Sequence, residues 1–440
     1  MHKKLATLIY LIILIICAPN KSMAITLQKC IKLGMAQNLT LQQERINHNI
    51  SKNNLKQKQA QTFGSLSTIG SYYHYNMPRT LVPMTPAGMS KDVATTTNLS
   101  MVGLKYTLPL FTGFAHTSNI VLAELQQKIN ETKINLSVQQ IVYNIKNLYL
   151  QSLSLQHQLS AQKKYTQSLN KLYEQIDLGV KIGKNAKVDL LKITSELEQS
   201  KATQTQILNS NQIVKATLAN LIDIPKIDKI NDIDINIKPI NLKLNKSLNP
   251  DIKLLQIYKQ ADLAILSDNQ IINRNKSKLY PQISFDAIYG QNFGPNDSTN
   301  AVPNTWNHTE TWQVGINLKW DIFDFGKNKA DIKQAELHKR QSLLKKLQIE
   351  KDLKLNIYTA IRNINTAIAN YNSAKTEYDL TNKTQNIELI KYRYNAINLN
   401  DLLQAKAKNQ IAKSKIISSK YTYQDNLYYL DYLLEKGTDK

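Results

Sequence analysis

Two aspartates are the residues whose type and spacing come closest to a chemical site. Asp189 and Asp401 are each followed by two leucines, and each stands six residues after a residue that tolerates left-handed backbone, Gly183 and Asn395 respectively. A carboxylate at the beginning of a helix can accept hydrogen bonds from free backbone N–H groups and interacts favourably with the positive end of the helix dipole. The spacing therefore predicts two helical hairpins, each with a carboxylate beside its turn.

The rest of the sequence gives no sign of catalysis. Its seven histidines never fall at the spacings of a metal site, and it contains neither a nucleophile motif nor a phosphate-binding loop. We therefore expect a protein that is not an enzyme, with no catalytic residue, no metal ion and no cofactor.

The N-terminal residues have the layout of a secretory signal. Two lysines precede an apolar run from Leu5 to Ala18, and Ser22-Met23-Ala24 supplies small residues at the spacing that a signal peptidase recognises. We predict a signal peptide over residues 1–24, because the apolar run is too short for a typical spanning helix. Cys17 would suit a lipoprotein, but Ile16 occupies the position where lipoprotein processing requires a small residue.

The net charge of +23 does not indicate a nucleic-acid partner. Almost all of the basic residues are lysines, and they are spread along the chain among Asn, Gln and Ile instead of forming one patch with interleaved aromatic residues. A genome bias toward Lys, Asn and Ile explains this distribution more simply, and export of the chain argues in the same direction.

An internal duplication organises the mature chain. Leu110-Phe111 recurs as Ile322-Phe323, 212 residues later, and an Ala-Glu-Leu triplet and the Asp-Leu-Leu triplet that begins at Asp189 recur at the same offset. We therefore divide the chain into two structural repeats, residues 25–238 and 239–440. Each repeat is predicted to contain an opening helix, two strands and a long helical hairpin.

Both repeats contain amphipathic strands, at 66–75, 102–110, 283–289 and 312–322. In the last of these, polar or small side chains alternate with apolar ones. The apolar side chains are Trp312, Val314, Ile316, Leu318, Trp320 and Ile322. Such alternation gives a strand one apolar and one polar face. Two structures explain that pattern: a half-buried sheet on a soluble core, or a barrel strand that faces lipid on one side and water on the other.

After its second strand, each repeat is predicted to be helical for an unusual length. No proline interrupts residues 114–182, and Ile134, Val138, Ile141 and Ile145 follow the four-three spacing of a coiled coil. About 65 helical residues would extend for roughly 100 Å, far beyond a compact domain. The opening helices (27–60 and 250–276) and the return helices (188–222 and 400–435) are shorter, and a short connecting strand is predicted at 233–237.

Taken in order, these segments resemble the TolC outer-membrane efflux family over the whole mature chain. The resemblance rests on the opening Leu27-Gln28-Lys29-Cys30-Ile31, on strand-to-helix junctions at 108–113 and 320–326, and on the two hairpin turns. It implies an α+β fold in which three chains each give four strands to one twelve-stranded transmembrane β-barrel, while long coiled-coil hairpins form an α-barrel across the periplasm. Four strands alone cannot enclose an aqueous lumen, and their edges need partners.

The resemblance also implies a function and its partners. Family members act as homotrimeric, passive exit ducts in contact with outer-membrane lipid. They work with a periplasmic adaptor and an inner-membrane transporter, in a tripartite efflux pump or a type I secretion system. The alternatives are a periplasmic adaptor and a structural coiled-coil protein of an export apparatus, but an adaptor would show one hairpin and a stalk would lack the strand alternation.

Finally, the resemblance assigns roles to residues near the hairpin turns. In the family the hairpin tips close the periplasmic entrance, and Tyr392 and Asp189 match the partners of a bond between hairpins. Asp401 matches one carboxylate of an acidic constriction. Gln404 stands where the best-known members have a second carboxylate, and Ile397 where they have an arginine. We therefore expect a less negative constriction and a simpler latch.

Overall fold

The computed structural model describes residues 24–83, 93–237, 252–297 and 305–437. Residues 1–23 of the predicted signal peptide, with Cys17, and the predicted boundary between the repeats lie outside these ranges. The chain forms two compact units: Met1–Glu44, Ile134–Gln256 and Ile349–Lys440 make the first, and Arg45–Lys133 and Ile257–Gln348 make the second. Each compact unit therefore combines segments from both repeats.

The long helices repeat with the offset found in the sequence. α4 (Ala115–Lys181) and α7 (Lys327–Arg393) have 67 residues each, and the return helices α5 (Lys187–Leu221) and α8 (Leu399–Leu433) have 35 each. Every end in the second copy lies 212 residues after its counterpart: 115 and 327, 181 and 393, 187 and 399, 221 and 433. The predicted duplication is thus reproduced to the residue at all of these helix ends.

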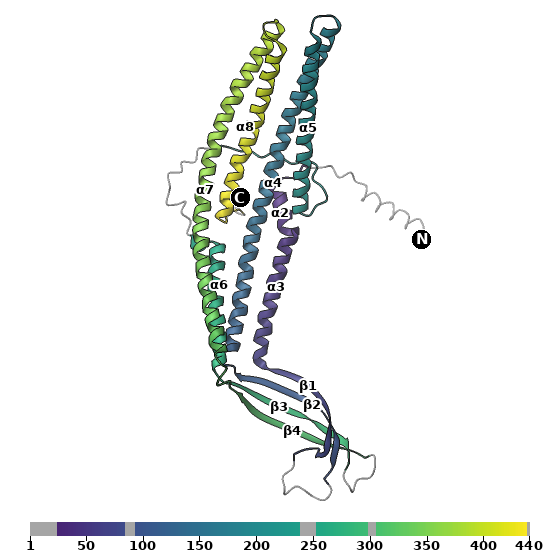
Figure 1. Cartoon of the computed structure of the whole chain (residues 1–440), viewed down its shortest axis with the longest axis vertical. Coiled ribbons are helices and arrows are strands. Elements are labelled where there is room, and N and C mark those ends of the chain that lie inside the picture. Colours follow the sequence, from purple (N-terminus) through teal and green to yellow (C-terminus); the bar gives the residue numbers. More distant parts are fainter. Residues whose placement is uncertain (1–23, 84–92, 238–251, 298–304, 438–440) are drawn as a thin grey trace, which may run out of the picture. The chain divides into compact units, whose positions relative to one another are not determined.

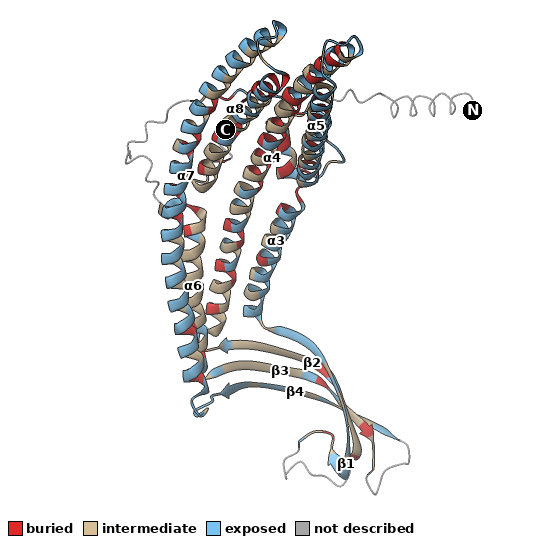
Figure 2. Ribbon diagram, turned by 45° about the horizontal axis from the view of Figure 1, so that its top comes forward, coloured by how far each residue is buried: buried red, intermediate tan, exposed pale blue. Residues whose placement is uncertain are grey.

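In the first unit, α5 returns along α4 and α8 returns along α7, which makes two hairpins (Figure 1). The buried positions form narrow stripes along helices that are otherwise exposed or half-buried (Figure 2). On α4 the stripe includes Ile145, Tyr149 and Leu153, which are all fully buried. Narrow apolar stripes of this kind are what coiled-coil seams produce.

The opening helix of the first repeat differs from the prediction of one continuous helix. It is divided at Asn38 into α2 (Leu27–Gln37) and α3 (Leu39–Ala60). Asn38 has extended backbone (ψ 123°), its amide donates to the Leu221 carbonyl at 2.9 Å, and its side-chain oxygen accepts from the Leu41 N–H at 3.1 Å. A side chain that hydrogen-bonds to the backbone of α5 and to the first turn of α3 competes with continuous helical hydrogen bonding at Asn38.

The predicted connecting strand at 233–237 is wrong, because these residues are irregular. The described part of this connection holds one isolated bridge, in which Ile230 pairs with Ile25 in parallel. The buried Tyr149 hydroxyl lies 3.0 Å from the Ile25 carbonyl oxygen and 2.6 Å from that of Asn231. The Ile25 carbonyl also accepts from the Asn231 N–H at 3.0 Å in this bridge, so the Tyr149 hydroxyl supports the short pairing and bonds the Asn231 carbonyl beyond it.

The second unit holds one antiparallel sheet in the order β1-β2-β3-β4. Its strands are β1 (Ser65–Thr80), β2 (Thr95–Phe111), β3 (Gln282–Pro295) and β4 (Trp306–Lys319). Strands β2 and β3 pair across the two repeats, so β1 and β4 are left at the edges. The unit also contains α6 (Gln256–Lys276) from Ile257 onward and parts of α3, α4 and α7. None of the helices in the described ranges is both long and apolar enough to cross a membrane.

The last strand is displaced from its predicted limits. It begins at Trp306 and ends at Lys319, so Trp320 and Ile322 lie beyond it. The Trp320 indole N–H donates to the Leu279 carbonyl at 3.2 Å, and the indole remains half exposed. Alternation of residue types alone does not show where ladder hydrogen bonding stops.

Candidate functional site: hairpin tips and an exposed sheet face

The two hairpin turns have the same backbone geometry. Gly183 (φ 74°) and Asn395 (φ 57°) both adopt left-handed backbone. The Gly183 N–H donates to the Val180 carbonyl at 3.1 Å, and the Asn395 N–H donates to the Tyr392 carbonyl at 3.0 Å. Each turn therefore closes its preceding helix with backbone hydrogen bonds and places the start of the return helix beside it.

Neither aspartate is the N-cap of its helix. Asp189 and Asp401 are each the third residue of a return helix, after the N-caps Ala186 and Asn398. The Asn398 side chain accepts a hydrogen bond from the Asp401 N–H at 3.0 Å, whereas Ala186 has no side chain that could cap. Asp401 and Gln404 are exposed and Asp189 is half-buried. The Asp401 carboxylate therefore faces solvent, where it can attract cations.

Tyr392, at the end of α7, reaches the turn of the first hairpin. Its hydroxyl hydrogen-bonds with the Asn185 side chain, and Asp189 lies close enough to act on it electrostatically. Burial raises the pKa of Tyr392, Asp189 raises this pKa further, and the Asn185 hydrogen bond opposes both. A raised pKa keeps the hydroxyl neutral at pH 7. Its burial beside Asp189 therefore becomes unfavourable only as the pH rises above the ordinary tyrosine value of about 10.

Asn185 is a tip residue that the sequence did not single out. Its backbone N–H donates to the Gly179 carbonyl at 3.1 Å, and its side chain lies over Gly179, where an added Cβ would come within 2.0 Å of the Asn185 Oδ1. The available signal in the sequence was Gly179, a single glycine near the end of a long helix that contains no other. Its lack of a side chain makes room for the amide that meets Tyr392.

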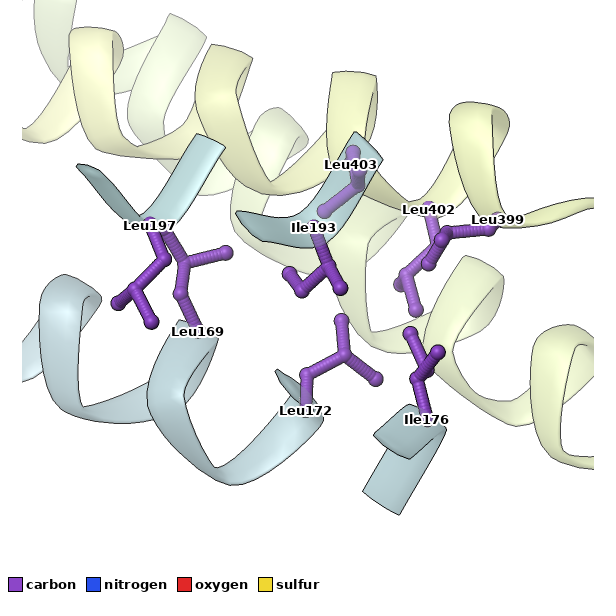
Figure 3. Packing of buried hydrophobic residues seen from close by; sticks show 8 residues of the cluster. All are labelled: Leu169, Leu172, Ile176, Ile193, Leu197, Leu399, Leu402 and Leu403. Atoms are coloured by element: carbon purple, nitrogen blue, oxygen red, sulfur yellow. The ribbon is translucent and has the colours of Figure 1, made fainter. Parts of the chain in front are cut away.

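An apolar cluster joins the two hairpins next to these turns (Figure 3). Eight buried residues from α4, α5 and α8 form this tip cluster: Leu169, Leu172, Ile176, Ile193, Leu197, Leu399, Leu402 and Leu403. Tyr392 and Ile397 pack against it. Ile397, which replaces the arginine expected from the resemblance, thus joins the apolar packing instead of supplying a charge.

One face of the sheet in the second unit is apolar and exposed. Trp312, Val314, Ile316 and Leu318 are 58–70% exposed. The register places Tyr289 opposite Trp312, Phe285 opposite Ile316 and Leu108 opposite Phe285, so the apolar surface continues from β4 to β2. An exposed apolar surface of this extent marks a site of contact with lipid or protein.

The opposite face of the sheet carries a polar network. The Asp286 carboxylate accepts hydrogen bonds from the Thr107 hydroxyl at 2.6 Å, the Ser284 hydroxyl at 3.1 Å and the Asn317 amide. The Lys105 ammonium lies 3.6 Å away. A sheet with apolar side chains on one face and a hydrogen-bonded carboxylate on the other suits a wall between lipid and water.

No group of three His, Cys, Asp or Glu side chains in the described residues could hold a metal ion. The hairpin tips present the Asp401 carboxylate to solution, and the sheet can place an apolar face against lipid.

Comparison with known proteins gives one family and one fold. A family model described as outer membrane efflux protein matches residues 31–222 and 258–434. No curated protein matches the chain. Solved structures with the same fold include a membrane protein from Pseudomonas aeruginosa, with 17% identity, a TM-score of 0.76 and 93% of both chains covered.

Two further solved structures are similar. The CmeC outer membrane channel of Campylobacter jejuni is 15% identical with a TM-score of 0.76, and the match covers 93% of this chain and 86% of that one. The open state of the MtrE outer membrane channel of Neisseria gonorrhoeae is 15% identical with a TM-score of 0.72, and the match covers 93% of this chain and 89% of that one. At these identities, the likeness establishes the fold.

Proposed function

The chain belongs to the outer membrane efflux protein family, and we propose that three copies of it form a passive exit duct coupled to a periplasmic adaptor and an inner-membrane transporter. The protein lies in the outer membrane and extends into the periplasm. It supplies no energy itself, and the same duct serves a tripartite efflux pump or a type I secretion system.

The exposed apolar face of the sheet is the observation that carries this proposal. Trp312, Val314, Ile316 and Leu318 would cost free energy in water, and lipid would remove that cost. The edge strands β1 and β4 also leave backbone groups to be paired. Three copies would pair every edge and give twelve strands, enough for a barrel with a water-filled lumen.

A trimer in the outer membrane is the first expected result. Separation of cell membranes should place the full-length protein in the outer-membrane fraction, and amine crosslinking of intact cells should give a species of three chains. Purified protein should form ion-conducting channels in planar lipid bilayers. A soluble periplasmic monomer would contradict the proposal.

Asp401 is proposed to set the ion preference of the entrance. It is exposed, its backbone N–H is already capped by Asn398, and in a trimer three such carboxylates would form one ring. Asp401→Asn should therefore lower the cation preference of the channel and cost no more than about 1 kcal/mol of stability, from the lost interaction with the helix dipole. Gln404→Glu, which places a second carboxylate one turn further along, should raise that preference.

Reversal potentials measured across a salt gradient test both changes. Asp379→Asn is the matched control, because Asp379 is also exposed but lies within α7, far along the sequence from the turn. Unchanged selectivity in both Asp401→Asn and Gln404→Glu would show that these positions do not line the conducting path.

A further inference from the structure

A lysine is buried between the two hairpins. Lys406 on α8 is 7% exposed, and its Nζ lies 3.3 Å from the Ser168 hydroxyl of α4. Within the described part of the chain no carboxylate pairs with it. A neutral hydroxyl compensates only a fraction of the hydration that a buried ammonium loses.

The neighbours of Lys406 make this burial costly. Leu402 and Leu403 lie one turn earlier on α8, and Leu169 follows Ser168 on α4; all three belong to the tip cluster (Figure 3). Burial lowers the pKa of Lys406, with no opposing contribution from a nearby charge. The ammonium therefore sits at the border of the apolar packing that joins the hairpins.

The contacts beyond Lys406 are polar but neutral. The Gln410 amide donates to the Gln162 side-chain oxygen at 2.8 Å, and the Gln162 amide donates to the Ser200 hydroxyl at 2.9 Å. Neutral groups of this kind can satisfy one another when buried. Lys406 is thus the member of this seam that would gain most from water.

We propose that Lys406 is a positioning residue that weakens the packing of α8 against α4 and thereby sets how readily the periplasmic entrance opens. Separation of the hairpins would hydrate the ammonium, so its burial favours the separated arrangement relative to an apolar side chain at this position. The inference rests on the proposed function, in which the hairpin tips close the duct.

The opposite role for Lys406, holding the hairpins together, predicts an effect of opposite sign. If the Lys406–Ser168 hydrogen bond instead clasps the hairpins together, removal of the lysine would loosen them. Because the two roles predict opposite changes in the open probability of the channel, a single variant decides between them. Lys406→Met keeps an unbranched side chain, one heavy atom shorter, and removes the charge. Lys408→Met is the matched control, because Lys408 is exposed on the same helix.

Channels of the full-length protein in planar bilayers provide the measurement. Lys406→Met should lower the open probability by roughly tenfold, since replacement of a buried charge by an apolar side chain stabilises packing. Lys408→Met should leave it unchanged. An unchanged or raised open probability in Lys406→Met would overturn the proposal, whereas absence of channels in the wild type would contradict the proposed function itself.

A second measurement needs no variant at Lys406. Acetic anhydride should modify Lys406 more slowly than Lys408 in the wild-type trimer, as read by mass spectrometry. In Tyr392→Phe, which removes a contact between the tips, Lys406 should become several-fold more reactive while Lys408 does not change. Equal reactivity of Lys406 in both proteins would overturn the proposal even if Lys406→Met failed to assemble.

Discussion

Lysine in place of Ile316 or Leu318 should destabilise the assembled protein by about 2–4 kcal/mol, the range for a charge facing lipid near the membrane midplane. Both side chains lie on the apolar face of β4 and are 69% and 65% exposed. In water, such positions would accept lysine at little cost. A large penalty is therefore expected only if lipid covers them.

Gly315→Lys is the matched control on the other face of the same strand. An added Cβ at Gly315 would meet no atom within 4 Å, so there is room for the side chain. Lysine there, or at Asn317, should be tolerated better because it would reach water. Heat stability of the trimer in detergent and its yield in the outer membrane measure the difference. Equal damage on both faces would favour a sheet buried in a soluble core.

The fold was predictable where one physical pattern dominated. A continuous coiled-coil seam without proline leaves few alternatives to a long helix, and α4 lies within a residue of its predicted limits. Alternation along β4 predicted its two faces correctly but misplaced its ends. The ends of β4 depend on its pairing with β3, which runs from Gln282 opposite Lys319 to Pro295 opposite Trp306. This register is not encoded in the sequence of β4 alone.

Local competition explains the fold errors. The isoleucines at 233–237 alternate as in a strand, yet the described connection pairs only at Ile230, and the Tyr149 hydroxyl bonds the Asn231 carbonyl next to it. Asn38 breaks the opening helix because its side chain bonds to Leu221, far along the chain. Both outcomes depend on contacts between distant segments, which periodicity within one segment cannot indicate.

The turns beside the candidate site were predictable, and the contacts of the side chains near them were less so. Residue types placed Gly183 and Asn395 at turns, and both have left-handed backbone. The partner of Tyr392 was harder, because it depends on the rotation of α7 about its axis and on space above Gly179. The structure gives the hydrogen bond to Asn185 and leaves Asp189 as a neighbouring charge.

The latch between the tips can be tested through this difference. Tyr392→Phe and Asn185→Ala should each raise single-channel conductance, because each weakens the packed tips by about 1–3 kcal/mol when a half-buried partner is left unsatisfied. The double variant should add little to either, since both changes remove the same hydrogen bond. Asp189→Ala should also raise conductance, but it should add to Tyr392→Phe, because it removes a nearby charge and not that bond.

Asn398→Ala separates latch from helix capping. It removes the cap on the Asp401 N–H and should cost about 1 kcal/mol of stability. Because Asn398 does not touch Tyr392 through any hydrogen bond in the described chain, the coupling between Tyr392 and Asn185 should survive in this background. If Tyr392→Phe and Asn185→Ala were fully additive, Tyr392 would have another partner in the assembled duct. Non-additivity with Asp189→Ala instead would identify that partner as the carboxylate, and the tips would then rearrange when three chains meet.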